Sequence, residues 1–346
     1  IIGQHPDTGV RYTYTEPRRD SINGTIYADT ASIGSVAFEN MDIVGSNGFG
    51  VCNVSQSNDS YANFKLTLKD VTYTGPHAAY NPWGIVRLED FRFRSEINGA
   101  DQLGNVAMAR VVETAGQIDI DHNADYSTAT VFVFTKRNAS YPNSLTMEGS
   151  TRAQIVTQTS LLYCSSGTLI NWTVKIGADV KMETEEAIID TGTVPLGDLI
   201  VEDNAHLNMQ QINSITPRHM LHISGVLSVG EGSTFIAERH GGAPALIWLQ
   251  NSKSLQFNNP KHVRLYSRQG ELFLFSQNAQ EVTVDILADT INLWQSNPTP
   301  DYSIDNMPTG IWNKDDTAEP VDLQLVYSAD GTLKNLVSSN LIPGVD

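Results

Sequence analysis

The chain has 346 residues, of which 40% are hydrophobic, and a formal net charge of −17 from 22 basic and 39 acidic residues. This charge repels the phosphates of nucleic acids, so the composition argues against a nucleic-acid partner. No run of 18 apolar residues occurs, which argues against a membrane span. The chain begins at Ile1 rather than Met and shows no signal peptide, so we expect a fragment excised from a longer exported protein.

Short segments of alternating apolar residues follow one another along most of the chain. Residues 1–34 are polar and contain Pro6 and Pro17, which predicts an N-terminal cap. Residues 101–113 favour one short helix or an irregular connection. Segments typical of half-buried strands occur, in chain order, at 36–44, 64–73, 85–93, 116–120, 130–134, 145–147, 153–156 and 161–164.

The next four segments can be laid over one another, each as a strand, a polar turn and a second strand. They are 174–182, 200–209, 227–236 and 255–265. If Ile176, Val201, Val229 and Phe257 are equivalent positions, the steps between them are 25, 28 and 28 residues. A period in this range predicts a solenoid, in which each coil buries its apolar face against its neighbours.

The same pattern favours parallel over antiparallel strands. The period exceeds the spacing of about 8 to 12 residues that sandwiches show. Asn and Gly lie inside each coil, where corners need positive φ, rather than in two-residue turns between strands. After about Leu293 the pattern changes, with Pro298 and Pro300 near Trp294. We therefore expect an all-β parallel solenoid over 1–290, including the cap at about 1–34, and a C-terminal cap or hairpin over 291–346.

Three segments resemble the pectate-lyase-like adhesive domains of Gram-positive bacterial surface proteins. They are Leu-Lys-Asp-Val-Thr-Tyr-Thr-Gly-Pro-His-Ala-Ala-Tyr-Asn-Pro-Trp-Gly at 68–84, Val-Leu-Ser-Val-Gly-Glu-Gly-Ser-Thr-Phe at 226–235 and Leu-Gln-Phe-Asn-Asn-Pro-Lys-His-Val at 255–263. The binding regions of serine-rich-repeat adhesins are similar in kind. The resemblance covers most of 35–290 and implies a right-handed, pectate-lyase-like β-helix. It also implies an extracellular protein, displayed on the bacterial cell surface, that binds host or plant glycans such as pectin or mucin.

Polysaccharide lyases and hydrolases share this solenoid, so an enzyme acting on uronate polymers is the alternative. Pectate lyases usually carry Arg-x-Pro-x-x-Arg, and the nearest segment, 216–219, lacks that spacing. Hydrolases need paired acids, but the only Asp-Asp is Asp315-Asp316, and neither Gly-His-Gly nor Arg-x-Lys occurs. We therefore expect a binding module rather than an enzyme. A structural stalk or a self-association module is the third hypothesis.

Arginine, histidine and aromatic side chains outside the inward positions are the candidates for glycan binding. Arginine forks hold carboxylates, and aromatic faces hold sugar rings. Strand alternation places the arginines of 85–94 on the solvent side. The first set is Tyr80, Trp83, Arg87, Arg92 and Arg94. A second set, expected along one side of the later coils, is Arg218, His219, Arg239, His240, His262 and Arg264. In the competing interpretation the arginines pair with Glu89, Asp90 or Glu96, and Trp83 packs under a loop.

One acidic segment and the histidines complete the candidates. Asp119, Asp121 and Asp125 match three positions of an EF-hand loop, which suggests Ca²⁺, but Ala124 and Thr130 stand where Gly and Glu are required. The competing interpretation is a strand whose alternate residues point inward, with no cofactor. Protonation of all 8 histidines would change the net charge from −17 to −9. This predicts that binding to acidic polysaccharide or mucin strengthens near pH 4 to 5, at about the lower end of the histidine range.

Overall fold

The computed structural model describes strands and the turns between them, and its described residues contain no helix. The described ranges are 1–16, 26–27, 34–45, 50–53, 61–95, 104–123, 130–134, 142–164, 169–190, 196–212, 219–240, 246–249, 254–258, 260–267, 273–275, 283–287, 291–295, 311–313, 320–327 and 333–338. Contacts divide the chain into two compact units. Unit 1 comprises Ile1–Ile170 with Gly192–Val194, and unit 2 comprises Asn171–Thr191 with Pro195–Asp346.

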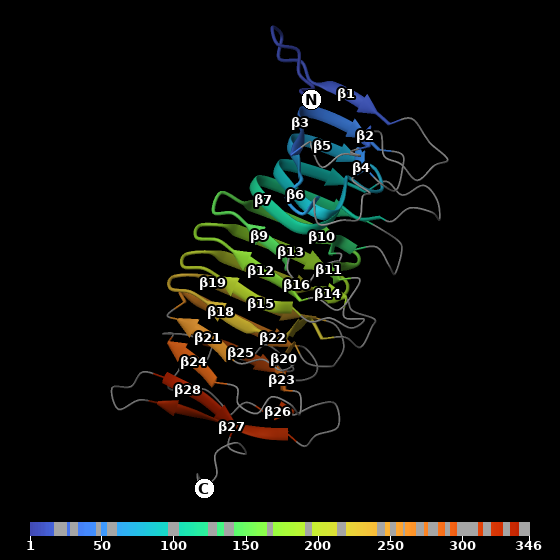
Figure 1. Cartoon of the computed structure of the whole chain (residues 1–346). Coiled ribbons are helices and arrows are strands. Elements are labelled where there is room, and N and C mark those ends of the chain that lie inside the picture. Colours follow the sequence, from blue (N-terminus) through green and yellow to red (C-terminus); the bar gives the residue numbers. More distant parts are fainter. Residues whose placement is uncertain are drawn as a thin grey trace. The chain divides into compact units, whose positions relative to one another are not determined.

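Unit 1 is built on one long parallel ladder, whose rungs are visible in Figure 1. Its strands, each paired with the next, are β1 (Tyr12–Thr15), β3 (Ser35–Val44), β5 (Lys65–Thr74), β6 (Ala79–Arg94), β7 (Ala107–His122) and β10 (Arg152–Thr157). A second parallel set contains β2 (Ile26–Tyr27), β4 (Cys52–Asn53), the first residues of β6 and β7, β8 (Thr130–Phe134) and β11 (Ser160–Cys164). β9 (Asn143–Met147) pairs with β7.

Unit 2 repeats this arrangement with three parallel ladders. The first holds β13 (Asp179–Thr184), β16 (His206–Gln211), β19 (Thr234–Arg239), β22 (His262–Ser267) and β25 (Ile291–Gln295). The second holds β17 (Leu221–Ile223), β20 (Ile247–Leu249), β23 (Phe273–Phe275) and β26 (Ile311–Asn313). The third holds β12 (Ile170–Val174), β15 (Leu196–Val201), β18 (Val226–Val229), β21 (Ser254–Asn258) and β24 (Thr283–Leu287). β14 (Ile189–Asp190) is a short strand of the same unit. The prediction of an all-β parallel solenoid is confirmed.

Inward-facing columns of apolar side chains form the core. In unit 1, the paired residues Ile43, Tyr73, Phe93, Ile120 and Ile155 are each at most 1% exposed. The rings of Tyr73 and Phe93 stack with their centroids 5.8 Å apart. Each coil thus covers the apolar face of the one before it, and this burial is the main source of stability in such a fold.

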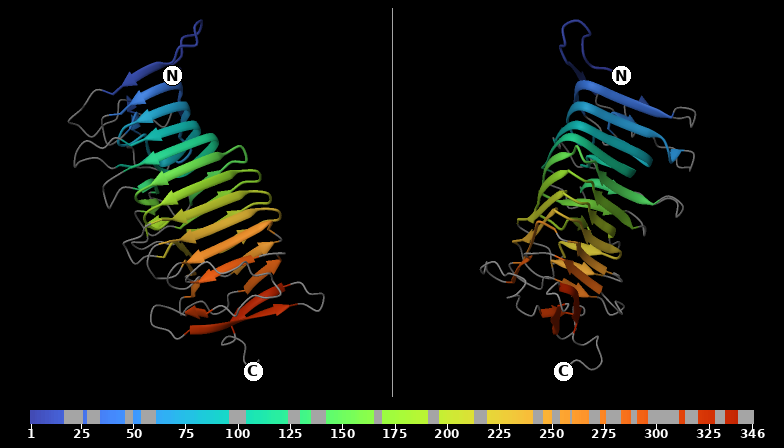
Figure 2. Two further views of the ribbon diagram at one scale, coloured as in Figure 1. Left: turned by 180° about the vertical axis from the view of Figure 1, so that it is seen from behind. Right: turned by 90° about the vertical axis from the view of Figure 1, so that its left-hand side faces the viewer.

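The coil length is regular in unit 2 and irregular in unit 1. From Val180 the register advances to Leu207, Phe235, Val263 and Ile291, in steps of 27, 28, 28 and 28 residues. In unit 1 the steps from Ile43 to Tyr73, Phe93, Ile120 and Ile155 are 30, 20, 27 and 35 residues. Figure 2 shows the stacked rungs within each unit.

Two sequence-based expectations were wrong in detail. Ile176 is 60% exposed, so it is not equivalent to the buried Val201. The amide of Glu202 bonds to the carbonyl of Val174, which is fully buried and occupies the inward position instead. Residues 107–113 are strand rather than helix, because they pair with β6 and tertiary pairing overrides local propensity. The parallel ladder of unit 2 continues to Gln295.

The last described strands change direction. β27 (Pro320–Tyr327) pairs antiparallel with β26 and with β28 (Leu333–Ser338), and β28 pairs antiparallel with β24. Such pairing covers part of the open edge that a parallel ladder leaves at its end. The division of the chain at 290/291 into a solenoid and a cap stays a prediction. No helix among the described residues has the length and apolar character needed to cross a membrane.

Candidate functional site

A corner inside the long strands of unit 1 sets the geometry of its outer surface. Asn40, Asp70, Asp90 and Gly116 have φ values of 56°, 46°, 48° and 66°, a left-handed conformation that Asn, Asp and Gly tolerate best. The corner shifts the alternation, so that both Leu88 and Phe91 point inward. The strands β3, β5, β6 and β7 therefore each present two outer faces, one before the corner and one after it.

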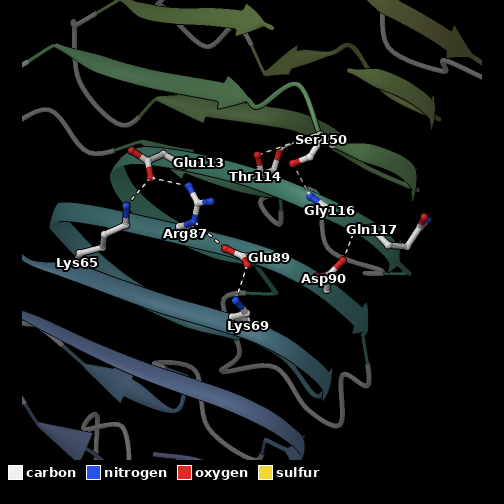
Figure 3. Close-up of polar contacts among 11 residues, drawn as sticks. Lys65, Lys69, Arg87, Glu89, Asp90, Glu113, Thr114, Gly116, Gln117 and Ser150 are labelled. Atoms are coloured by element: carbon white, nitrogen blue, oxygen red, sulfur yellow. Dashed lines mark hydrogen bonds and ion pairs between the residues drawn. The ribbon is translucent and has the colours of Figure 1, made fainter. Parts of the chain in front are cut away.

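Oppositely charged side chains cover the face before the corner (Figure 3). Lys65 Nζ lies 2.7 Å from Glu113 Oε2, and Arg87 bridges Glu113 at 3.5 Å and Glu89 at 3.1 Å. Lys69 lies 2.8 Å from the other oxygen of Glu89. The hydrogen bond from Lys69 lowers the pKa of Glu89, and the same bond raises the pKa of Lys69. Arg87 is thus part of a network of three cations and two carboxylates, as the competing interpretation predicted for Glu89.

The face after the corner carries two columns of side chains in register. The first column is Asp42, Thr72, Arg92, Asp119 and Gln154, and the second is Val44, Thr74, Arg94, Asp121 and Val156. Arg94 holds Asp119 with both terminal nitrogens, at 2.6 and 3.2 Å, and this hydrogen bonding raises the pKa of Arg94. Arg92 also pairs with Asp119, at 3.3 Å, and its side chain is 57% exposed.

A groove of ≈ 400 Å³ lies at this corner and on the face after it. Its lining comes from four strands of the long ladder and from the residue before β1: Arg11, Asp42, Asp70, Val71, Thr72, Asp90, Phe91, Arg92, Gln117 and Asp119. We call it the corner groove. Arg11 donates to Asp70 Oδ1 at 2.6 Å and to the carbonyls of Asp70 and Met41. Asp90 accepts from the amide of Gln117 at 2.9 Å.

The structure brings only part of the first predicted set to the corner groove. Arg92 lines it, and Arg94 contacts it through Asp119. Tyr80 and Trp83 are half-buried on the first part of β6 and do not line the groove. The carbonyl of Trp83 accepts a hydrogen bond from Arg110, which also donates to the carbonyls of Ala62 and Pro142. Trp83 is therefore half-buried and does not line the groove with Arg92.

The second predicted set does not form a line of exposed cations. Arg239 is fully buried, because it follows Phe235 and Ala237 in the inward alternation of β19 and stands in register with the buried Gln211. His219 is 7% exposed and its ring packs 4.9 Å from that of Trp248. The expected placement of these two side chains was wrong.

Two of the remaining members of the second set, His240 and Arg264, lie near one acid. His240 approaches Glu238 Oε2 at 3.3 Å, and Arg264 pairs with the other oxygen of the same carboxylate. His262 is half-buried on β22, in register with Thr234. Arg218 lies outside the described residues. The pairing register of β19 and β22 determines which of these side chains are neighbours. In this register Arg264 is paired with Ile236, and Arg239 is paired with Ser267.

No protein-family model, curated protein or solved structure matches this chain. The likeness to pectate-lyase-like adhesive domains stays a prediction from the sequence segments that carry it.

The structure describes two of the three acids in the predicted Ca²⁺ segment, Asp119 and Asp121. Ile118 and Ile120 are buried and point inward, as the competing interpretation held. The carboxylate of Asp119 is already paired with two arginines. Asp121 is exposed one column away, and Asp125 lies outside the described residues. Among the residues that the structure describes, no group of three His, Cys, Asp or Glu side chains could hold a metal ion.

Sequence reasoning missed most of the corner groove. Arg11 lies in a segment expected only to cap the fold, and it contacts Asp70, which is 59 positions away along the chain. No sequence motif pointed to Asp42, Asp70 or Gln117 as residues of a site. A signal was present in the Asn or Asp that breaks the alternation in 36–44, 64–73 and 85–93, because such residues mark stacked corners.

Proposed function

We propose that this chain is the carbohydrate-binding region of a bacterial cell-surface adhesin, and that the corner groove binds acidic polysaccharide of the pectin type or mucin glycans. The observation that carries the proposal is the lining of the groove. Two arginines and four aspartates lie within one hollow, on successive rungs. Carboxylates and guanidinium groups are planar and bidentate, and they match the paired hydroxyls and carboxylates of uronate chains.

The contacts of Arg92 support an acidic ligand. Arg92 is more than half exposed and holds Asp119 at 3.3 Å, whereas Arg94 holds both oxygens of that carboxylate. Arg92 can therefore turn to a ligand carboxylate while Asp119 keeps its fork with Arg94. The exchange costs little, because an exposed ion pair contributes only about 0 to 1 kcal/mol.

Replacement of Arg92 tests the site. Arg92→Gln should weaken binding to polygalacturonate about 10- to 100-fold, because it removes a charged hydrogen bond to ligand, worth about 1.5 to 3 kcal/mol. Arg87→Gln is the matched control, since Arg87 is a half-buried arginine of the same strand that does not line the groove. Calorimetric titration of both variants gives the comparison. Equal affinity of Arg92→Gln and wild type would contradict the assignment of the site.

A screen of pectins and mucins separates this proposal from its alternatives. Retained binding and the release of unsaturated or reducing sugar ends should be measured in the same samples. We expect binding without product. Product would indicate a polysaccharide lyase or hydrolase instead, and neither binding nor product would indicate a stalk or a self-association module.

A further inference from the structure

A second groove, of ≈ 700 Å³, lies on the outer surface of unit 2. We call it the unit 2 groove. Its floor follows the outward column Ile200, Ser228 and Gln256, which register places on β15, β18 and β21. The full lining is Ile176, Ile200, Val201, Glu202, Asp203, Ser228, Gly230, Gln256, Phe257 and Asn258. Ile176 is 60% exposed, a high value for an isoleucine in a folded chain.

The acids of this groove are engaged by the fold itself. Glu202 accepts from Lys175 at 2.9 Å through one oxygen and from the amide of Ile176 at 3.1 Å through the other. Asp203 accepts from the amide of Glu231 at 2.8 Å. The absence of a side chain at Gly230 allows the backbone there to lie close to Asp203, because a Cβ at position 230 would be 2.4 Å from Asp203 Oδ1. The exposed polar side chains of the lining are Asp203, which is held by the amide of Glu231, and the amides of Gln256 and Asn258.

From this lining we infer that the unit 2 groove is a second ligand site, and that it binds a neutral oligosaccharide. Side-chain amides and a hydroxyl both donate and accept, as sugar hydroxyls do. Ile176 and Ile200 offer an apolar surface to the C–H face of a sugar ring. The volume falls within the range of about 300 to 1,000 Å³ that small-ligand sites show.

Other ligand classes fit less well. An extended peptide binds a sheet through a free strand edge, whereas the neighbours β15, β18 and β21 are already paired with one another. A purely apolar ligand would bury the amides of Gln256 and Asn258 without hydrogen-bond partners, which costs free energy. An acidic sugar would meet the carboxylates of Glu202 and Asp203 and, in the lining, no arginine. The proposal goes beyond the corner groove and stands independently of it.

Two exposed isoleucines of unit 2 allow a matched test. Ile176→Ser removes the apolar wall, and Gln256→Ala removes an amide from the floor. Ile212→Ser is the control, because Ile212 is 47% exposed and does not line the groove. All three side chains are exposed, so the variants should fold, which circular dichroism checks. The probes are cellotetraose and β-1,4-galactotetraose as neutral chains and tetragalacturonate as the acidic chain.

Wild type should bind at least one neutral tetrasaccharide in calorimetric titration. Ile176→Ser and Gln256→Ala should each weaken that binding about tenfold, and Ile212→Ser should leave it unchanged. Tetragalacturonate should bind the groove variants as it binds wild type. The inference is overturned if neither neutral probe binds at millimolar concentration, or if the groove variants bind like the control. Arg92→Gln should weaken the binding of tetragalacturonate and leave the binding of the neutral tetrasaccharides unchanged. Failure of one proposal can therefore be distinguished from failure of the other.

Discussion

Single polar residues at the corners hold the coils in place. Asp90, Asp198 and Asp203 each accept a hydrogen bond from a backbone amide on the following coil, at 2.9, 2.9 and 2.8 Å. Asn204 has a φ of 56°, a left-handed conformation that Asn adopts at little cost. Part of the acidity of the chain therefore satisfies backbone groups, and the net charge is not a simple measure of the surface available to ligands.

A buried histidine couples the stability of unit 1 to pH. His77 is fully buried, and its Nε2 donates to the carbonyl of Ala79 at 2.9 Å. Burial lowers its pKa from 6.5 to about 4. The folded state keeps His77 neutral at a pH where the unfolded chain takes up a proton. His77 thus contributes full stability above about pH 6.5, and this contribution is lost as the pH falls toward about 4.

Unfolding by denaturant at pH 7 and pH 4.5 measures this effect. We expect His77 to account for a loss of about 3 kcal/mol between its unfolded and folded pKa values, most of which occurs above pH 4.5. In His77→Gln the decrease in unfolding free energy between the two pH values should be smaller. His206→Gln is the control, because His206 is exposed. An identical pH dependence in His77→Gln and wild type would contradict the assignment.

At the scale of the element, one arginine attaches the first strand to the third rung of unit 1. Arg11 precedes β1, which pairs with β3, and donates to Asp70 on β5. Its two ion pairs reach Asp42 and Asp70 at 3.3 and 2.6 Å. Strands at the edge of a sheet open most readily and can then pair with other chains. A contact that holds the first strand on the ladder therefore reduces both local opening and aggregation.

Hydrogen exchange of residues 12–16 reports on this contact. Arg11→Met should speed exchange in that segment about fivefold, equivalent to about 1 kcal/mol, because the partners are half exposed and the interaction is screened by solvent. The amide of Glu16, bonded to the carbonyl of Val44 at 2.8 Å, is the most direct probe. Arg152→Met, which removes an arginine from β10, should leave this segment unchanged. Unaltered exchange in Arg11→Met would show that β1 is held by its ladder alone.

The whole molecule carries a charge of −17, which repels an acidic polysaccharide at neutral pH. Protonation of histidines reduces this repulsion, but not all of them contribute. His77 stays mostly neutral until about pH 4, and burial also lowers the pKa of His122. The full change to −9 is therefore not reached within the range in which we expect tighter binding.

Binding of polygalacturonate should be several times tighter at pH 4.5 than at pH 7.4, and the difference should shrink in high salt, which screens charge. Neutral galactan is the control and should show no such dependence. The protein must be shown to remain folded at pH 4.5, because the contribution of His77 to the stability of unit 1 decreases over the same pH interval. Equal affinity for polygalacturonate at the two pH values would exclude a charge-driven effect.

The sequence by itself determined the class of fold. Alternation in segments such as 85–93 and the 28-residue steps between Val201, Val229 and Phe257 were sufficient, because burial of apolar side chains follows strand period and coil repeat directly. It also identified Ile118 and Ile120 as inward residues.

Only the tertiary structure decided the surface. Three arginines that look alike in the sequence have different surroundings. Arg87 belongs to a charge network, Arg92 lines the corner groove, and Arg239 is fully buried. The coil lengths of 20 to 35 residues in unit 1 set which outward residues share a column, and no local pattern encodes them. Pairing register acts between residues far apart in the chain, so the neighbours of a surface side chain are fixed only when the coils stack.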